Sequence, residues 1–95
     1  MIEVLFSESE ITIRGHARAG PVGQDIVCSA VSTLFQTLAE SVRKLTEDYI
    51  SCVIKPGYAR LEYKDPSEKS RVLIDSFFIG CCGVAQSYPE HVTIK

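Results

Sequence analysis

Residues 25–47 read DIVCSAVSTLFQTLAESVRKLTE, and the spacing of their apolar residues decides the fold. Apolar side chains recur at steps of three and four, the pattern of a helix with one buried stripe: Val27, Val31, Leu34, Phe35, Leu38, Val42 and Leu45. Asp25 is a suitable N-cap, because its carboxylate can accept hydrogen bonds from the amides of the first turn. The stretch therefore predicts a central helix that begins after Asp25 and ends near Glu47.

The segment before this helix predicts a β-hairpin followed by a loop. Residues 2–6 and 11–17 are rich in apolar and β-branched side chains and partly alternate, with a polar break between them. Residues 18–24 contain Gly20, Gly23 and a proline, a composition that excludes a regular element. We expect two strands and then a mobile connection to the helix.

The segment after the helix predicts a second hairpin, a second helix and a closing strand. Residues 49–55 and 58–63 have strand character, and the Pro56-Gly57 dipeptide between them suits a tight turn. A helical apolar pattern follows from Ser67 or Asp65 to about Ala85, weakened in its last turns by two glycines, and residues 91–94 alternate like a strand. The order is ββαββαβ, which predicts an α+β fold with two helices packed on a mostly antiparallel sheet.

Length and composition restrict the class of protein. The 95 residues, with 45% hydrophobic and 23% charged side chains, predict one globular domain over residues 1–95. A net charge of -2 disfavours general nucleic-acid binding, and no segment has the pattern of a membrane span or a signal peptide, so we expect a cytoplasmic protein. The four cysteines are then expected as reduced thiols, and their spacing lacks the Cys-x-x-Cys pairs of structural zinc sites. We expect neither a metal nor a cofactor.

Two residues form a candidate catalytic pair. Cys28 falls in the first turn of the central helix, where partial positive charge and unpaired amides favour a thiolate and could also stabilise an oxyanion. His16 stands at the end of the second predicted strand, from which its imidazole could reach the start of the helix and exchange a proton with the thiol. Asp25 could orient His16 or a substrate amine, although N-capping explains this aspartate equally well.

The sequence around the pair resembles the ribosomal-processing cysteine protease family. That family has a Gly-His pair on a strand, a glycine-bearing loop, and a Gly-x-Asp-Ile-Val-Cys-Ala-Ala-Val-Ser helix start, which are similar to residues 15–17 and 23–32 here. Residues 78–80 and 88–92 also look like the C-terminal half of the family. The resemblance implies that Cys28 is the nucleophile and His16 its base, with Asp25 and Ser32 as supporting residues.

The same resemblance implies a substrate and an assembly. Family members remove an N-terminal extension from a bacterial large-subunit ribosomal protein, cutting after an apolar, aromatic-ending stretch, and look like homodimers. Gly15, with Gly20 and Gly23, would let the loop open and close over the substrate. Ser29 and the Arg18-Ala19 pair depart from the family pattern, which affects the expected substrate preference more than the chemistry.

Two other functions fit the same residues. A non-catalytic, ribosome-associated module could bind a peptide under the loop, with Cys28 only lining the groove. A redox sensor could use the electropositive helix start to favour oxidation of Cys28, although no resolving cysteine is near in the sequence. His16 discriminates between the three, because only the protease needs an imidazole within reach of the sulfur.

Overall fold

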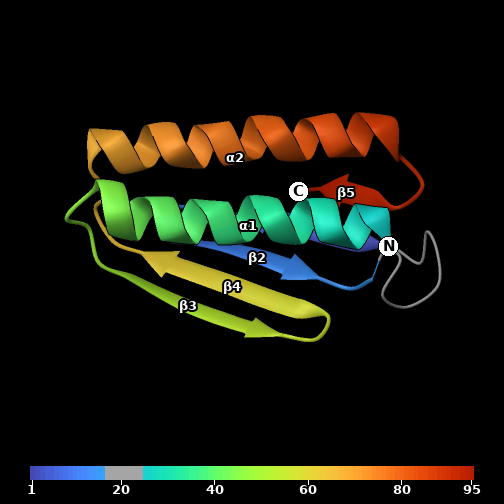
Figure 1. The fold of residues 1–95 in the computed structure, drawn as a ribbon, viewed down its shortest axis with the longest axis horizontal. Helices are drawn as coiled ribbons and strands as arrows, with labels where there is room; N and C mark the ends of the chain where they lie inside the picture. Colours follow the sequence, from blue (N-terminus) through green and yellow to red (C-terminus); the bar gives the residue numbers. More distant parts are fainter. Residues whose placement is uncertain (17–24) are drawn as a thin grey trace.

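A computed structural model describes residues 1–16 and 25–95 of the chain (Figure 1). The elements follow in the order β1 (Ile2–Phe6), β2 (Glu10–Arg14), α1 (Ile26–Leu45), β3 (Ile50–Lys55), β4 (Tyr58–Tyr63), α2 (Glu68–Ser87) and β5 (Val92–Ile94). This order and the two-layer arrangement confirm the predicted α+β fold. Within the described residues, neither helix combines the length and apolar character needed to cross a membrane.

The five strands form one sheet in the order β3-β4-β2-β1-β5. The pairs β1–β2, β2–β4 and β3–β4 are antiparallel, whereas β1 and β5 run parallel, with Ile2 opposite Val92. The sheet is therefore mostly antiparallel, as expected. Strand β3 lies at one edge of the sheet and β5 at the other.

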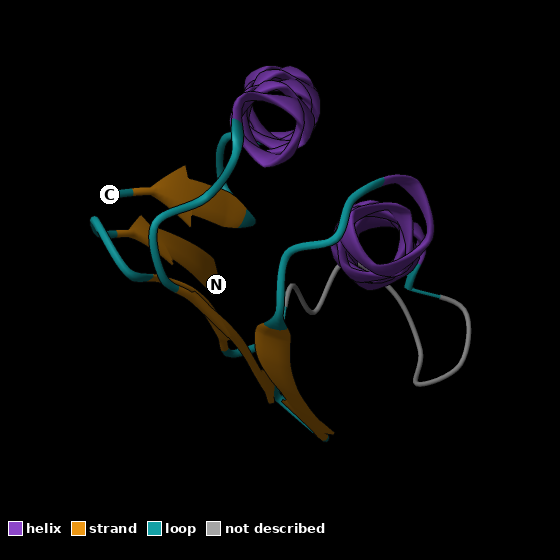
Figure 2. Ribbon diagram, turned by 90° about the vertical axis from the view of Figure 1, so that its left-hand side faces the viewer, coloured by secondary structure: helices purple, strands orange, loops and turns teal. Residues whose placement is uncertain are grey.

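Both helices lie on the same side of the sheet (Figure 2). The core forms where their apolar stripes meet the inward side chains of the strands, which alternate along each strand because successive residues point to opposite faces. Its buried residues include Val27, Val31, Phe35, Leu38 and Val42 from α1, Val4, Ile11 and Leu61 from the sheet, and Phe77 and Cys81 from α2. The stripe predicted for α1 is thus the centre of the core.

A polar cluster joins the end of α1 to the start of α2. Asp48 accepts hydrogen bonds from the backbone amide of Ser67, from its hydroxyl and from the hydroxyl of Ser70, while the Ser67 hydroxyl caps α2. These hydrogen bonds lower the pKa of the Asp48 carboxyl below its ordinary value. The cluster fixes the position at which α2 begins.

The structure shifts several predicted boundaries. Strand β2 ends at Arg14 and not at residue 17, because Gly15 has φ +97° and leaves the extended conformation. Helix α1 ends at Leu45, where the hydroxyl and amide of Thr46 both donate to the carbonyl of Val42. Helix α2 continues to Ser87, and β5 begins at Val92, one residue later than predicted.

The two glycines of α2 did not shorten the helix. At Gly80, a Cβ would lie 2.8 Å from Cδ2 of Leu34, so the glycine allows α1 and α2 to pack closely. At Gly83, a Cβ would have no neighbour within 4 Å. The loss of helix propensity at these positions is outweighed by the tertiary packing of the helix.

Candidate active site

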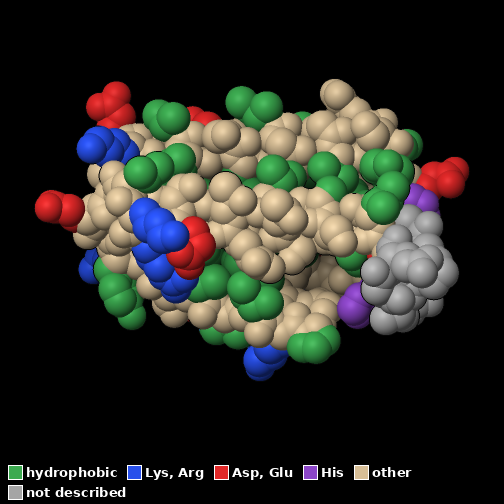
Figure 3. Space-filling model, in the orientation of Figure 1, with side chains coloured by type: hydrophobic (Ala, Val, Ile, Leu, Met, Phe, Trp, Pro, Cys, Tyr) green, Lys and Arg blue, Asp and Glu red, His purple; other side chains and the backbone are tan. Residues whose placement is uncertain are grey.

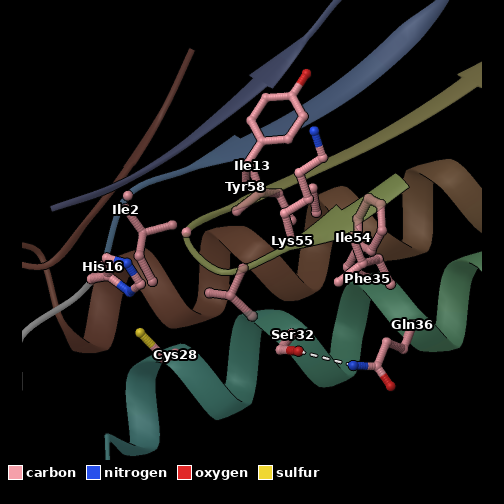
Figure 4. A pocket seen from close by; sticks show the side chains of 14 residues that line it. Ile2, Ile13, His16, Cys28, Ser32, Phe35, Gln36, Ile54, Lys55 and Tyr58 are labelled. Atoms are coloured by element: carbon pink, nitrogen blue, oxygen red, sulfur yellow. Dashed lines mark hydrogen bonds between the residues drawn. The ribbon is translucent and has the colours of Figure 1, made fainter. Parts of the chain in front are cut away.

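A cavity of about 150 Å³ lies between α1 and the β3–β4 hairpin and contains both members of the predicted pair. Figure 3 shows the surface hollowed beneath α1, close to the hairpin tip. Figure 4 shows its side chains, which come from the first half of α1, the start of β1, the end of β2 with the residues after it, the end of β3 and the start of β4. The lining residues include His16, Cys28, Ser32, Phe35, Gln36, Ile54, Lys55, Gly57 and Tyr58.

Cys28 is in the first turn of α1 and is partly buried at the edge of the core. Its neighbour Val27 is fully buried, so the Cys28 side chain is turned by about 100° from the centre of the apolar stripe. In Figure 4 its sulfur lies on the side of α1 that faces His16. The predicted position at the margin of the stripe is what brings the thiol into the cavity.

His16 is held from two sides by backbone contacts. The N-terminal ammonium of Met1 donates a 2.7 Å hydrogen bond to the His16 carbonyl, and the amide of Gly15 donates a 2.9 Å bond to the carbonyl of Gly57. These bonds tie the end of β2 to the start of β1 and to the hairpin tip. His16 therefore lies beyond the strand, not within it as predicted.

Gly57 provides the surface against which the His16 imidazole lies. Gly57 has φ +73°, and a Cβ at this position would lie 2.7 Å from Nε2 of His16. Only a residue without a side chain allows this approach at a left-handed φ without strain. The turn that sequence analysis predicted from Pro56-Gly57 is thus part of the site, a role that no local pattern indicated.

Gly15 is constrained by close packing. Its φ of +97° favours glycine, and a Cβ at this position would overlap the carbonyl oxygen of Met1. Packing and backbone conformation are therefore sufficient to explain the glycine beside His16. The hinge role expected for it stays a prediction, and Gly20 and Gly23 lie outside the described residues.

Asp25 is the N-cap of α1, as predicted. One carboxylate oxygen, Oδ1, accepts hydrogen bonds from the amides of Val27 and Cys28, each at 3.0 Å. Asp25 lines a second, more open depression together with Cys28 and Ser32, and it is absent from the lining of the cavity that holds His16. While the cap is intact, the amides of Val27 and Cys28 are directed to Asp25 and not to an oxyanion.

Ser32 lies one turn after Cys28 and lines the same cavity. Its hydroxyl accepts a 3.0 Å hydrogen bond from Nε2 of Gln36, the contact drawn in Figure 4. The sequence predicted Ser32 as a site residue but did not indicate four others that line the cavity: Gln36, Ile54, Lys55 and Tyr58. The helical spacing of residues 28, 32 and 36 would have indicated Gln36, whereas the three hairpin residues reach the cavity only through the fold of the sheet.

The remaining thiols lie in different surroundings. Cys81 is fully buried, and burial, with a smaller effect from Cys82, raises its pKa to about 12. A thiol with that pKa is unreactive at neutral pH. Among the described residues, no three histidine, cysteine or acidic side chains gather closely enough to hold a metal ion.

A cysteine at a helix start and a histidine beside it, in one partly apolar cavity, are typical of hydrolases that use a thiol nucleophile. The family model for the cysteine protease Prp matches residues 1–93, and the chain belongs to this family. The family predicted from the Gly15-His16 and Cys28 motifs is thereby confirmed.

One curated relative and several solved structures are similar to this chain over nearly its whole length. The ribosomal processing cysteine protease Prp of Mycoplasma genitalium is 27% identical over 95 residues, which cover the whole chain and 95% of the relative. The crystal structure of SMU.848 from Streptococcus mutans is 29% identical, with a TM-score of 0.80 over 99% of this chain and 90% of that one. Prp from Staphylococcus aureus with a covalently linked product peptide has a TM-score of 0.89 at 16% identity, covering 99% and 95% of the two chains, and shows the common fold.

Proposed function

We propose that this protein is a cytoplasmic cysteine endopeptidase that removes the N-terminal extension of a bacterial large-subunit ribosomal protein. The observation that carries the proposal is the shared cavity of Cys28 and His16. Membership of the cysteine protease Prp family supports the reaction, and the name of the Mycoplasma genitalium relative supports the substrate. The single domain of residues 1–95 would carry out the reaction without a metal, a cofactor, nucleic acid or a membrane.

In the proposed mechanism, the Cys28 thiolate attacks the carbonyl carbon of the scissile peptide bond. The C–N bond breaks as the His16 imidazolium donates its proton to the leaving amine, which leaves a thioester on Cys28. Water then attacks the thioester, His16 accepts a proton from that water, and the C–S bond breaks. The products are a carboxylate, a new N-terminus and the original thiolate–imidazolium pair.

The supporting residues act on the position of the thiol. The Asp25 cap fixes the first turn of α1, from which Cys28 projects, and so sets the place of the sulfur. Ser32 and Gln36 present polar groups along the same helix face. The cavity also contains Ile2, Ile13, Val31 and Phe35, an apolar lining that suits the apolar stretch expected before the scissile bond.

Cleavage of a peptide tests the proposal directly. Wild type, Cys28→Ala and His16→Ala are incubated with a peptide that spans an extended ribosomal-protein N-terminus from the same host, and the products are read by mass spectrometry. We expect one cut by wild type and none by either variant. Binding of the peptide by wild type without any cut would favour the non-catalytic peptide-binding module instead.

We also propose that the protein forms a homodimer, as the family resemblance implies. Exposed apolar side chains on α2 offer a surface for a second copy, notably Val72 and Ile79, which are 61% and 70% exposed. Sedimentation equilibrium of wild type and Ile79→Glu tests this. A dimer that the substitution dissociates supports the α2 interface, and a monomer at all concentrations rules out the homodimer.

A further inference from the structure

Strand β3 has an open edge, and the register of the sheet shows which of its N–H and C=O groups point away from β4. The amide of Gly15 donates to the carbonyl of Gly57, and the amide of Tyr63 donates to the carbonyl of Ser9. Along an antiparallel strand, successive residues direct their N–H and C=O groups to opposite neighbours. The N–H and C=O groups of residues 57, 59, 61 and 63 therefore point to β2, and those of residues 58, 60 and 62 point to β3. The register then pairs Tyr58, Arg60 and Glu62 with Lys55, Val53 and Ser51.

The intervening residues of β3 direct their N–H and C=O groups away from the sheet. These residues are Ile50, Cys52 and Ile54, and no strand among residues 1–16 and 25–95 pairs with that edge. None of the loop or side-chain hydrogen bonds formed by the described residues involves the backbone of Cys52 or Ile54. An edge with regularly spaced, unused donors and acceptors is a template for another strand.

The open edge leads into the candidate active site. Ile54 and Lys55, the last two residues of β3, line the same cavity as Cys28 and His16. Figure 1 shows β3 as the outermost strand, with its hairpin tip at the end of the molecule where α1 begins. The Ile54 side chain is 56% exposed although it points to the helix side of the sheet, opposite Ala59. An extended chain on this edge would reach the cavity at its tip.

We propose that the substrate peptide binds as an added β-strand on the open edge of β3, hydrogen-bonded to the backbone of Cys52 and Ile54. The proposal rests on the endopeptidase function stated above and specifies how that site holds its substrate. Main-chain bonds supply affinity without reading the substrate sequence, and the apolar cavity next to Cys28 selects the side chain near the scissile bond. An extended, unstructured N-terminal segment is the form of polypeptide that fits such an edge.

Backbone methylation of the substrate tests the proposal without changing the protein. A set of peptides carries one N-methyl group each, at positions three to seven residues from the scissile bond on either side. An added strand turns every second amide toward β3, so we expect KM to rise at alternate positions, by about two- to tenfold for each lost hydrogen bond. The alternation also gives the direction of the bound peptide relative to β3. Alternation before the scissile bond indicates a parallel strand, and alternation after it indicates an antiparallel strand. Equal KM values at all positions would overturn the proposal.

A matched pair of variants tests the protein side. Cys52→Pro removes the outward amide of β3 without removing a bond to β4, whereas Cys52→Ala alters the same side chain and keeps the amide. We expect Cys52→Pro to have a KM about two- to tenfold higher than that of Cys52→Ala, with the same kcat in both variants. Circular dichroism and thermal unfolding check that both variants fold.

The outcomes separate this proposal from the one on which it rests. If wild type cuts no peptide, the endopeptidase function fails. The added strand is then tested by fluorescence anisotropy, which compares the affinities of the methylated peptides with that of the unmethylated peptide. If wild type cuts and neither the methyl scan nor Cys52→Pro changes KM, the protease stands and the added strand is wrong. A shift of sedimentation equilibrium by Cys52→Pro, with KM unchanged, would assign the edge to a second copy of the chain and also overturn the proposal.

Discussion

Substitution of Gly57 by alanine should reduce activity by displacing His16. The new Cβ would lie 2.7 Å from Nε2 and 3.3 Å from Cε1 of the imidazole, whereas unstrained contacts of this kind are about 3.5–4.0 Å long. The imidazole must therefore move by roughly 1 Å, a displacement that can lower a catalytic rate by about 100-fold. We expect kcat to fall by about that factor in the peptide cleavage assay, with KM changed much less.

The same substitution also strains the backbone, so a control for stability is needed. An alanine at the φ of +73° is destabilising by about 1–2 kcal/mol. Gly83→Ala, in the exposed part of α2 where a Cβ has no neighbour within 4 Å, should stabilise the protein by about 0.5–1 kcal/mol. The double variant should recover about half of the lost free energy of unfolding, measured in urea, and none of the lost kcat.

Two results would refute this reasoning. Gly57→Ala with wild-type kcat would mean that the hairpin tip does not hold His16 in its working position. Recovery of kcat together with stability in the double variant would mean that the first loss came from partial unfolding. The pH dependence of kcat in Gly57→Ala adds a further readout, because a displaced imidazole changes that profile and a merely destabilised fold does not.

The remaining predictions concern the cap, the polar cluster and the thiols. If Asp25 only caps α1, Asp25→Asn should keep both stability and cleavage, while Asp25→Ala should lose about 1 kcal/mol of stability. An Asp25→Asn variant that is stable but does not cleave the peptide would instead show that the negative charge is needed. The pKa of Asp48 is lowered in the folded state, so its contribution to stability is present above its ordinary pKa of 3.8 and is lost as the pH falls through the lower folded value. Between about pH 5 and 2, the free energy of unfolding in urea should therefore fall less steeply for Asp48→Ala than for wild type. Parallel curves would contradict the assignment. Iodoacetamide at neutral pH should modify Cys28 before Cys81, whose pKa of about 12 and burial protect it, and mass spectrometry that finds Cys81 modified first in folded protein would exclude this order.

The features that the sequence predicted are local in the chain. The stripe of α1, its cap at Asp25 and the turn at Pro56-Gly57 each depend on spacing within a few residues, and each is present in the structure. Cys28 could be placed at the margin of the stripe for the same reason. Such features can be predicted from short stretches of sequence because helix periodicity and capping depend on residues within a few turns.

The features that escaped prediction depend on contacts between distant segments. The position of His16 beside Gly57 requires the β2–β4 register, and the tolerance of α2 for Gly80 requires Leu34 from the other helix. Likewise, the hairpin residues of the cavity reach Cys28 only after the sheet has formed. Periodicity carries no information about such pairs, so a single sequence indicated the candidate pair Cys28 and His16 but not the surface against which His16 lies.

The parallel pairing of β1 with β5 makes the folding of this protein non-local. It brings position 2 opposite position 92, so a loop that includes most of the chain must close before β1 has a neighbour on each side. Loop closure of this size slows folding relative to hairpin formation, which takes microseconds. Since Met1, directly before β1, also donates a hydrogen bond to the His16 carbonyl, the strand that depends on this long-range pairing also holds one side of the candidate site.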